Sequence, residues 1–329
     1  MHGLSRLSLS ALLAPALAFA LSLALIRTLL AGAGRGLFLD QPNQRSLHAS
    51  PIARVGGLGL MPATLTGMVL VGGAPLATGL ALGLMLLSVV DDWRGLSAAL
   101  RLPLHLAAGA LFVLHTVPAL GLPGLVLLAI AIGWMINLYN FMDGADGMAG
   151  GMALIGFGVY ALAAALGGEP AFAQLNLCVA AAALGFLVFN FPPARVFLGD
   201  AGSIPLGFLA GALGLQGWGL GLWPLWFPLV VFGPFVADAS VTLLRRALRG
   251  ERVWQAHRTH YYQRVILLGW SHRQTALAEY ALMAGSGLVA LLVVRHPVSV
   301  QMLALVGLAC AYLLAGWMID ARWRRRTSA

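Results

Sequence analysis

Residues 122–147 read LPGLVLLAIAIGWMINLYNFMDGADG. The first nineteen of them, 122–140, carry no charged side chain, and a helix needs roughly 20 apolar residues to cross the hydrocarbon core of a bilayer. Polar side chains then recur every three positions, at Asn137, Asn140 and Asp143, which places them along one face of a helical turn. The stretch therefore predicts a transmembrane helix that ends in a polar, glycine-rich loop.

Similar apolar runs fill the rest of the chain. Of its 329 residues, 60% are hydrophobic and 9% are charged, and the mean hydropathy is +0.87. A soluble core of this size does not need such a composition, whereas a helical membrane bundle does. We predict one all-α, polytopic membrane domain over residues 1–329, with about eleven transmembrane helices. The predicted spans are residues 8–31, 55–73, 74–91, 102–117, 122–140, 148–167, 173–190, 203–218, 222–243, 276–294 and 298–319.

The first run and the cysteines argue against three alternatives. The run at 8–31 is longer than the core of a secretory signal and follows a single Arg, so we interpret it as a retained helix. Cys178 and Cys310 lie in apolar runs without a nearby partner. That pattern argues against a disulfide framework and against a soft-metal site.

The basic residues predict the orientation of the chain. All of them are Arg, and the net charge is +9. Under the eleven-span prediction, Arg6 and Arg295 lie on one side and the other arginines on the opposite side. The positive-inside rule then places the N-terminus outside and the C-terminus in the cytoplasm, in the cell inner membrane. Topology and lipid contact account for the C-terminal arginines, whereas the loop arginines remain candidates for a site.

Acidic residues gather on the same predicted cytoplasmic side. A carboxylate near the centre of a span costs about 2.5–3.5 kcal/mol, and topology does not require it. The acids on this side are Asp40, Asp91, Asp92, Asp143, Asp146, Asp200, Asp238 and Glu251. Because carboxylates from five separate loops or helix ends converge at one depth, we predict a functional site there.

Asp91 and Asp92 end the predicted third span. Adjacent like charges raise each other's proton affinity, so a nearby cation or metal is needed to keep both ionised. After the fifth span, Asn140 and Asp143 offer hard oxygen ligands, and Gly144 lets a diphosphate approach the backbone. A magnesium-nucleotide site fits this segment. A solvated helix end is the alternative for the Asp pair, and calcium is the rival cation.

Residues 190–203 read NFPPARVFLGDAGS. Pro192 and Pro193 stop the preceding helix, and the Gly-Asp-x-Gly-Ser segment opens the next one. The start of that helix would offer backbone N–H groups to phosphate. Phe197 is either ordinary packing or a stacking surface for a base.

Asp238 lies seven residues before Arg245, about 10 Å below the membrane surface at about 1.5 Å per residue. An intramembrane carboxylate is a functional candidate. The alternative is a structural carboxylate that pairs with Arg245 or with another helix.

The loop that follows Asp238 carries candidate ligand contacts. Arg258 suits phosphate, and His257 and His260 suit sugar hydroxyls and amides. These two histidines have no third ligand at useful spacing, which argues against zinc. We assign no role to His105 or His272.

Five blocks, in chain order, carry a resemblance to a known family. They are DQPNQRSLHASPIARVGG, the Asp91–Asp92 pair with Arg101, NLYNFMDGADGMAGG, NFPPARVFLGDAGS and AHRTHYYQR. The chain resembles the polyprenyl-phosphate N-acetylhexosamine-1-phosphate transferase superfamily, which is glycosyltransferase family 4-like, and within it the bacterial branch that initiates O-antigen and teichoic-acid synthesis. The resemblance implies ten or eleven helices around a cytoplasmic-facing active-site cleft.

The resemblance also implies roles for individual residues. Asp200 and Asn140 would hold Mg²⁺, or Mn²⁺ as a substitute, with Asp143 close by. Asp91, Asp92 and Arg101 would act on the phosphates. Substrate contacts would come from Asp146, Asn190, Phe197, Asn43, Arg54, Asp238, His257, Arg258 and His260. One block departs from the family pattern, because related enzymes often have three His in the last block. Here only His260 remains, with Tyr262 and Gln263 at the other two positions.

The implied reaction transfers N-acetylhexosamine-1-phosphate from a UDP-sugar to a polyprenyl phosphate and releases UMP. A transporter would show internal repeats and charges near the bilayer centre, and a CDP-alcohol phosphotransferase would show a different Asp pattern on a shorter bundle. The expected partners are the UDP-N-acetylhexosamine, the lipid and the membrane, without nucleic acid. The sequence leaves open the hexosamine, the polyprenol length, the glycan pathway, a direct or covalent mechanism, and whether the protein forms a homodimer.

Overall fold

The computed structural model describes residues 12–33, 39–40, 51–253, 255 and 257–327. Helices make up nearly all of this part of the chain. The elements are α1 (Leu13–Ala33), β1 (Leu39–Asp40), β2 (Ile52–Ala53), α2 (Gly56–Val71), α3 (Pro75–Arg94), α4 (Ala98–Thr116), α5 (Leu122–Phe141), α6 (Met148–Leu166), α7 (Pro170–Asn190), α8 (Asp200–Gly219), α9 (Trp226–Val231), α10 (Gly233–Leu248), α11 (Tyr261–Leu267), α12 (His272–Val293) and α13 (Val298–Thr327). The prediction of a helical membrane protein is confirmed.

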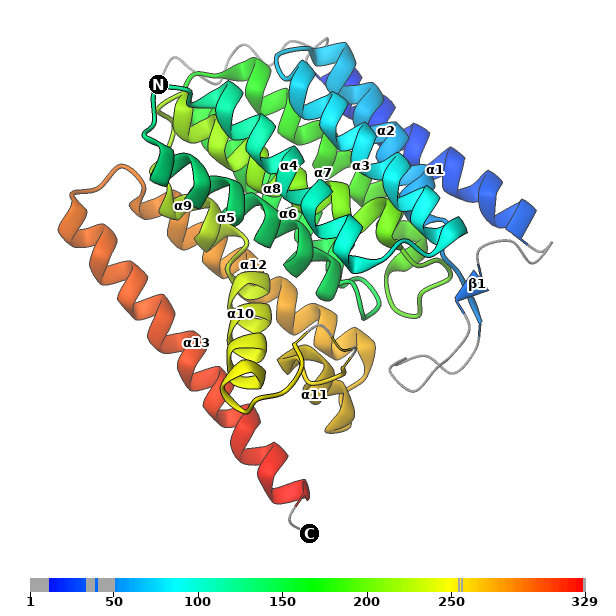
Figure 1. Cartoon of the computed structure of the whole chain (residues 1–329), viewed down its shortest axis with the longest axis vertical. Helices are drawn as coiled ribbons and strands as arrows, with labels where there is room; N and C mark the ends of the chain where they lie inside the picture. Colours follow the sequence, from blue (N-terminus) through cyan, green and yellow to red (C-terminus); the bar gives the residue numbers. More distant parts are fainter. Residues whose placement is uncertain (1–11, 34–38, 41–50, 254, 256, 328–329) are drawn as a thin grey trace.

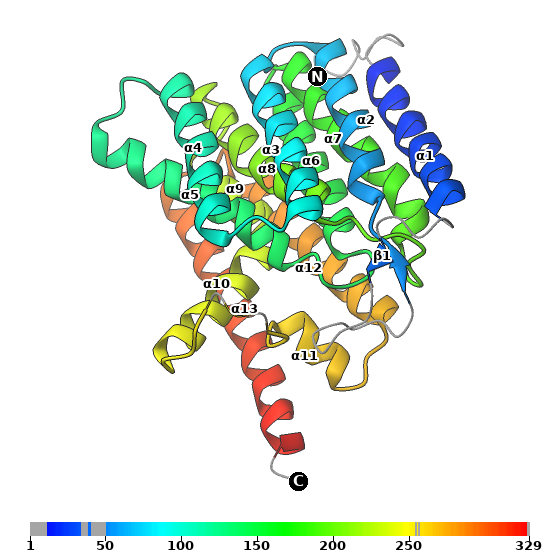
Figure 2. The same ribbon diagram turned by 45° about the vertical axis from the view of Figure 1, so that its right-hand side comes forward.

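The long helices α1–α8 pack side by side in one bundle (Figure 1). Within it, α6 and α7 are the most enclosed of the membrane-length helices, with 67% and 72% of their apolar windows buried. By contrast, the apolar window of α13 has no buried residue. Both views show α10, α11 and the C-terminal end of α13 at one end of that bundle (Figures 1 and 2).

Small residues allow α2 and α8 to approach each other closely. A Cβ atom at Gly57 would collide with the backbone of Gly202, so both positions need glycine for the two helices to touch. Gly57 lies in the first turn of α2 and Gly202 in the first turn of α8. The contact therefore joins the starts of two helices that are far apart in the sequence.

The predicted ninth span, 222–243, is wrong as a single helix. The chain forms α9, ends it at Phe232, and begins α10 at Gly233 with a proline in its first turn. Proline at position 234 has no N–H to donate and restricts the residue before it, so the apolar run is divided at this point. The ten other predicted spans each correspond to one helix, with shifted ends.

Eight helices of the described part are long and apolar enough to cross a membrane. They are α1, α3, α4, α5, α6, α7, α12 and α13. The 16-residue α2 is a shorter apolar helix. The number of eleven crossings therefore stays a prediction.

Candidate active site

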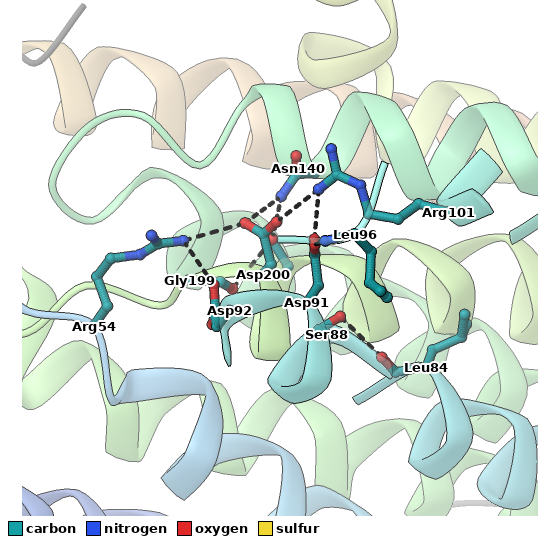
Figure 3. A network of polar contacts seen from close by, with 11 residues as sticks. Arg54, Leu84, Ser88, Asp91, Asp92, Leu96, Arg101, Asn140, Gly199 and Asp200 are labelled. Atoms are coloured by element: carbon teal, nitrogen blue, oxygen red, sulfur yellow. Dashed lines mark hydrogen bonds and ion pairs between the residues drawn. The ribbon is translucent and has the colours of Figure 1, made fainter. Parts of the chain in front are cut away.

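The acids predicted to act together come from three places in the bundle. Asp91 and Asp92 lie in the last turn of α3, Asp143 follows α5, and Asp200 is the first residue of α8. Figure 3 shows Asp91, Asp92 and Asp200 pointing toward one another, with Arg54 on one side and Arg101 on the other. We call these four acids and two arginines the acidic cluster.

Arg54 is brought to the acidic cluster by backbone pairing. Antiparallel strands β1 and β2 pair Leu39 with Ala53, and Ala53 also bridges Val196 in the loop before α8. The N–H of Phe197 donates to the carbonyl of Ala53 at 2.8 Å, and the N–H of Gly56 donates back to the carbonyl of Phe197 at 2.9 Å. As a result, the Arg54 guanidinium lies 3.4 Å from Asp200 and 3.8 Å from Asp92.

Arg101 binds the acidic cluster from α4. Its Nη1 lies 2.7 Å from Oδ2 of Asp91 and 3.6 Å from Oδ2 of Asp200. The other Asp91 oxygen accepts the N–H of Leu96 at 2.7 Å, because the chain turns sharply at Gly95, which has a φ of 64°. Both oxygens of Asp91 are thus occupied, whereas Asp92 has one longer ion pair.

Asn140 and Asp143 lie beside Asp200. The Asn140 amide N–H₂ donates to Oδ1 of Asp200 at 3.1 Å and to Oγ of Ser203 at 2.9 Å. Removal from water, and then the charge of Asp200, raises the pKa of Asp143 well above its ordinary range. A cation bound here would oppose both effects and favour the ionised form.

The donors of the acidic cluster fit a magnesium ion that arrives with a phosphorylated substrate. In the described residues, no group of three or more His, Cys, Asp or Glu side chains is placed to hold a metal alone. Mg²⁺ commonly takes only one or two carboxylates, with water and substrate phosphates as its other ligands. Four carboxylates face two guanidiniums here, so negative charge is in excess. The side-chain amide of Asn140 would have to rotate so that its oxygen, rather than its nitrogen, faces the ion.

Asp146 and Asn190 tie two loops together. The backbone N–H of Gly147 donates to Oδ1 of Asn190 at 2.9 Å, and the Asn190 amide donates to the carbonyl of Val196 at 2.8 Å. Asp146 accepts the N–H of Ala194 at 3.0 Å and lies 3.2 Å from His272. These contacts hold the loop after α5 against the loop before α8.

Asp238 is saturated by contacts from its own chain. It accepts hydrogen bonds from the N–H groups of Tyr261 and Tyr262 at 2.9 and 3.0 Å and from the Thr242 hydroxyl at 3.0 Å, and it contacts Nδ1 of His260 at 3.1 Å. The carboxylate thereby fixes the start of α11. It does not pair with Arg245, which binds Asp320 on α13 instead. Arg264 of α11 also binds Asp320, at 2.8 Å.

Asp238 of α10 and residues 257–263 form a contact region that we call the α10–α11 junction. It touches the end of α5. The rings of His260 and Phe141 stack with centroids 6.4 Å apart, and the Tyr262 hydroxyl donates to the Phe141 carbonyl at 3.3 Å. Tyr262 fills the space beside Gly144, where a Cβ would collide with its hydroxyl. Tyr262, which replaces one of the three histidines, therefore lies against the loop that carries Asp143.

Gln263 and His257 complete this junction. The Gln263 side chain accepts the N–H of His260 at 3.2 Å and donates to the Tyr262 hydroxyl at 3.1 Å. His257 packs on His260 with ring centroids 4.8 Å apart, and burial, followed by the charges of His260 and Arg246, lowers its pKa to about 4. Arg258 is exposed, and Asn43 lies outside the described residues. The binding roles of these residues stay predictions.

Two polar residues beside the acidic cluster are not predicted from the sequence. Ser203 accepts from Asn140, and its position three residues after Asp200 was the available signal. His105 follows Arg101 by one helical turn, is 5% exposed, and has no hydrogen-bond partner on either ring nitrogen among the described residues. Its i, i+4 spacing from Arg101 is the available signal.

Comparisons with known sequences point to one family of enzymes. The profile of glycosyl transferase family 4 matches residues 74–217, which include α3 to α8 and most of the acidic cluster. A Bacillus subtilis (strain 168) protein named probable undecaprenyl-phosphate N-acetylglucosaminyl 1-phosphate transferase is 30% identical over 262 residues, covering 74% of this chain and 73% of that protein.

Two further relatives carry related names. The decaprenyl-phosphate N-acetylglucosaminephosphotransferase of Mycobacterium tuberculosis (strain H37Rv) is 27% identical, covering 73% of this chain and 71% of that protein. The phospho-N-acetylmuramoyl-pentapeptide-transferase of Synechococcus sp. (strain RCC307) is 31% identical, covering 69% of this chain and 72% of that protein. The chain therefore belongs to glycosyl transferase family 4 and is a membrane-embedded phosphosugar transferase.

Proposed function

We propose that this protein transfers N-acetylhexosamine-1-phosphate from a UDP-sugar to a polyprenyl phosphate, such as undecaprenyl phosphate, and releases UMP. The observation that carries the proposal is the acidic cluster, in which four carboxylates and two guanidiniums from separate elements meet. Such a group can bind and orient two phosphorylated substrates. The product would initiate a cell-surface polysaccharide, either O-antigen for lipopolysaccharide or a cell-wall glycan.

Bond making and breaking balance without a covalent intermediate. A phosphate oxygen of the lipid attacks the sugar-proximal phosphorus of the UDP-sugar, and the bond from that phosphorus to the bridging oxygen breaks. UMP leaves with the bridging oxygen. One phosphoanhydride replaces another, so the reaction has little net driving force and is reversible.

The two acids of the pair have different roles in this proposal. Asp91 is occupied by Arg101 and by the N–H of Leu96, so it holds Arg101 in place. Asp92 has a longer, 3.8 Å ion pair with Arg54, which leaves it able to orient or deprotonate the lipid phosphate. Arg54 and Arg101 would steady the phosphate oxygens by charge-assisted hydrogen bonds.

Asp200, with Asn140 and Asp143 beside it, would hold Mg²⁺ or Mn²⁺. When bound, the ion would neutralise the diphosphate charge and align it with the attacking phosphate. Asp146, Asn190 and Phe197 would contact uridine. The sugar would lie toward His257, Arg258 and His260.

The product identity tests this function directly. Purified protein is incubated with undecaprenyl phosphate and, separately, UDP-GlcNAc, UDP-GalNAc or UDP-glucose, and the lipids and nucleotides are analysed by mass spectrometry. At least one UDP-HexNAc should give a lipid diphosphate sugar together with UMP. Release of UDP would instead indicate transfer of the sugar without its phosphate, and would contradict the proposal.

Nucleotide exchange tests the mechanism. With direct attack, labelled UMP enters UDP-HexNAc only when the lipid diphosphate sugar is present. A covalent sugar-phosphate on Asp200 would allow exchange without any lipid. Lipid-free exchange at a rate comparable to turnover would therefore replace direct attack with the covalent route.

The same proposal places the acidic cluster on the cytoplasmic side, where UDP-sugars are made. Cysteines introduced at Ser97 and Thr259 should resist an impermeant thiol reagent in intact cells and react after the membrane is opened. Ready labelling of either one in intact cells would reverse the proposed orientation.

A further inference from the structure

A groove between α1 and α7 lies outside the acidic cluster. Its volume is about 540 Å³, and its lining residues are Leu23, Arg27, Leu30, Val188, Phe189 and Arg195. Four of the six are apolar, and the two others are arginines. The acidic cluster, in contrast, is built from α3, α4, α8 and the segments around α2 and α5.

The two arginines reach this groove from different elements. Arg27 lies six residues before the end of α1, about 9 Å from that end at about 1.5 Å per residue. Arg195 follows α7, and its guanidinium lies 5.0 Å above the Phe189 ring while one Nη donates to the Val188 carbonyl at 3.2 Å. Both side chains are exposed.

Neither arginine has a carboxylate partner in the described part of the chain. An unpaired charge on a membrane-facing helix is costly unless it reaches water or an anion. A guanidinium has five N–H donors, and its planar fork matches two phosphate oxygens. The groove therefore combines unsatisfied phosphate donors with an apolar wall.

We propose that this groove binds an anionic phospholipid, with the headgroup phosphate between Arg27 and Arg195 and an acyl chain along Leu23, Leu30 and Val188. Free phosphate would leave the apolar wall uncovered, which favours a lipid. The reacting phosphates have their own guanidiniums at Arg54 and Arg101, which favours a phospholipid over the polyprenyl acceptor.

The groove is connected to the acidic cluster through the loop that carries Arg195. The N–H of Arg195 donates to the Phe189 carbonyl at 2.8 Å, and the residues after it pair with Ala53 and lead to Asp200. A lipid held by Arg195 would thereby steady the loop that presents Asp200.

Native mass spectrometry of the full chain in detergent tests the proposal without turnover, so it can fail or succeed independently of the proposed function. The probe is phosphatidylglycerol, with phosphatidylcholine as the neutral comparison. We expect wild type to retain phosphatidylglycerol. The Arg27→Gln/Arg195→Gln variant should bind it about 25-fold more weakly, at about fivefold for each charge. The matched control, Arg273→Gln/Arg322→Gln, removes two exposed arginines elsewhere and should bind like wild type.

Three results would overturn the proposal. The first is equal retention of phosphatidylglycerol by wild type and by the Arg27/Arg195 variant. The second is displacement by millimolar inorganic phosphate, which would indicate a simple anion site. The third is stoichiometric displacement by undecaprenyl phosphate, which would indicate that the groove takes the acceptor. The conservative variant Arg27→Lys/Arg195→Lys should keep most of the binding, which separates charge from folding.

Discussion

Asp238 accepts hydrogen bonds from four groups of its own chain and is 8% exposed, whereas the side chain of Asp200 is 22% exposed and lies 3.4 and 3.6 Å from two shared guanidiniums. Both carboxylates follow apolar stretches of the sequence, which makes both functional candidates. The two carboxylates differ in how fully groups of the protein itself satisfy them. Asp238 is matched by donors within the fold, which suits a structural support. Around Asp200, negative charge exceeds positive charge, which suits a site that is completed by ligands.

The largest effect should follow substitution of Asp200. Asp200→Asn keeps the shape but removes a charge on which the proposed cation and phosphates depend, so turnover should fall by about 10³-fold or more. The melting temperature should change little, because the side chain is part-exposed and its two ion pairs, at 3.4 and 3.6 Å, are long. Glu169→Gln, at an exposed loop, is the control. Turnover near the wild-type value would remove Asp200 from the site.

Removing the metal should also distinguish Asp200 from Asp238. Excess chelator should abolish transfer, and Mg²⁺ or Mn²⁺ should restore it. Asp200→Asn should require more metal for any remaining activity, whereas Asp238→Asn should respond like wild type. Full turnover in excess chelator would refute the proposed cofactor.

Asp238→Ala should act mainly on stability. It leaves buried N–H groups of Tyr261 and Tyr262 without an acceptor, at a cost of about 3 kcal/mol in the free energy of unfolding. Thermal melting in detergent should show the loss, and hydrogen exchange should rise at these two amides. An unchanged melting temperature with lost turnover would instead make Asp238 a ligand contact.

A smaller effect should follow changes where the loop of Asp143 meets the α10–α11 junction. Gly144→Ala places a methyl group against the Tyr262 hydroxyl and displaces the loop of Asp143, so kcat/KM should fall about tenfold to a hundredfold. Tyr262→Phe removes that hydroxyl and should be milder. The double variant should recover part of the loss in a double-mutant cycle. Additive losses would show that the collision is not the cause.

The smallest effect concerns acid stability at the α10–α11 junction. The pKa of His257 is lowered to about 4 by burial, compared with about 6.5 for an unfolded histidine. The folded state therefore favours the neutral ring, and its contribution to stability is present above about pH 6.5 and is lost as pH falls toward 4. His257→Gln should flatten the fall in melting temperature over this range. A parallel fall in both proteins would exclude His257 as the cause.

Much of this organisation is predictable from local sequence. Apolar runs identified the helices, and the order of the Asn140, Asp143 and Asp200 motifs identified the residues that meet. The failure at 222–243 arose because hydropathy averages over the position where Pro234 divides the run. The partners of Asp238 could not be predicted, because the bonds to His260, Tyr261 and Tyr262 span more than twenty residues and depend on how the junction folds.

Asp320, near the end of the chain, has a practical consequence for anyone preparing this protein. It binds Arg245 of α10 and Arg264 of α11, while the apolar part of α13 is exposed along its length. Near its C-terminal end, α13 is thus bound to α10 and α11 by two ion pairs. A truncation that ends before Asp320 would remove the carboxylate partner of both arginines at once. Its product should be prone to proteolysis at residues 249–253, which follow α10.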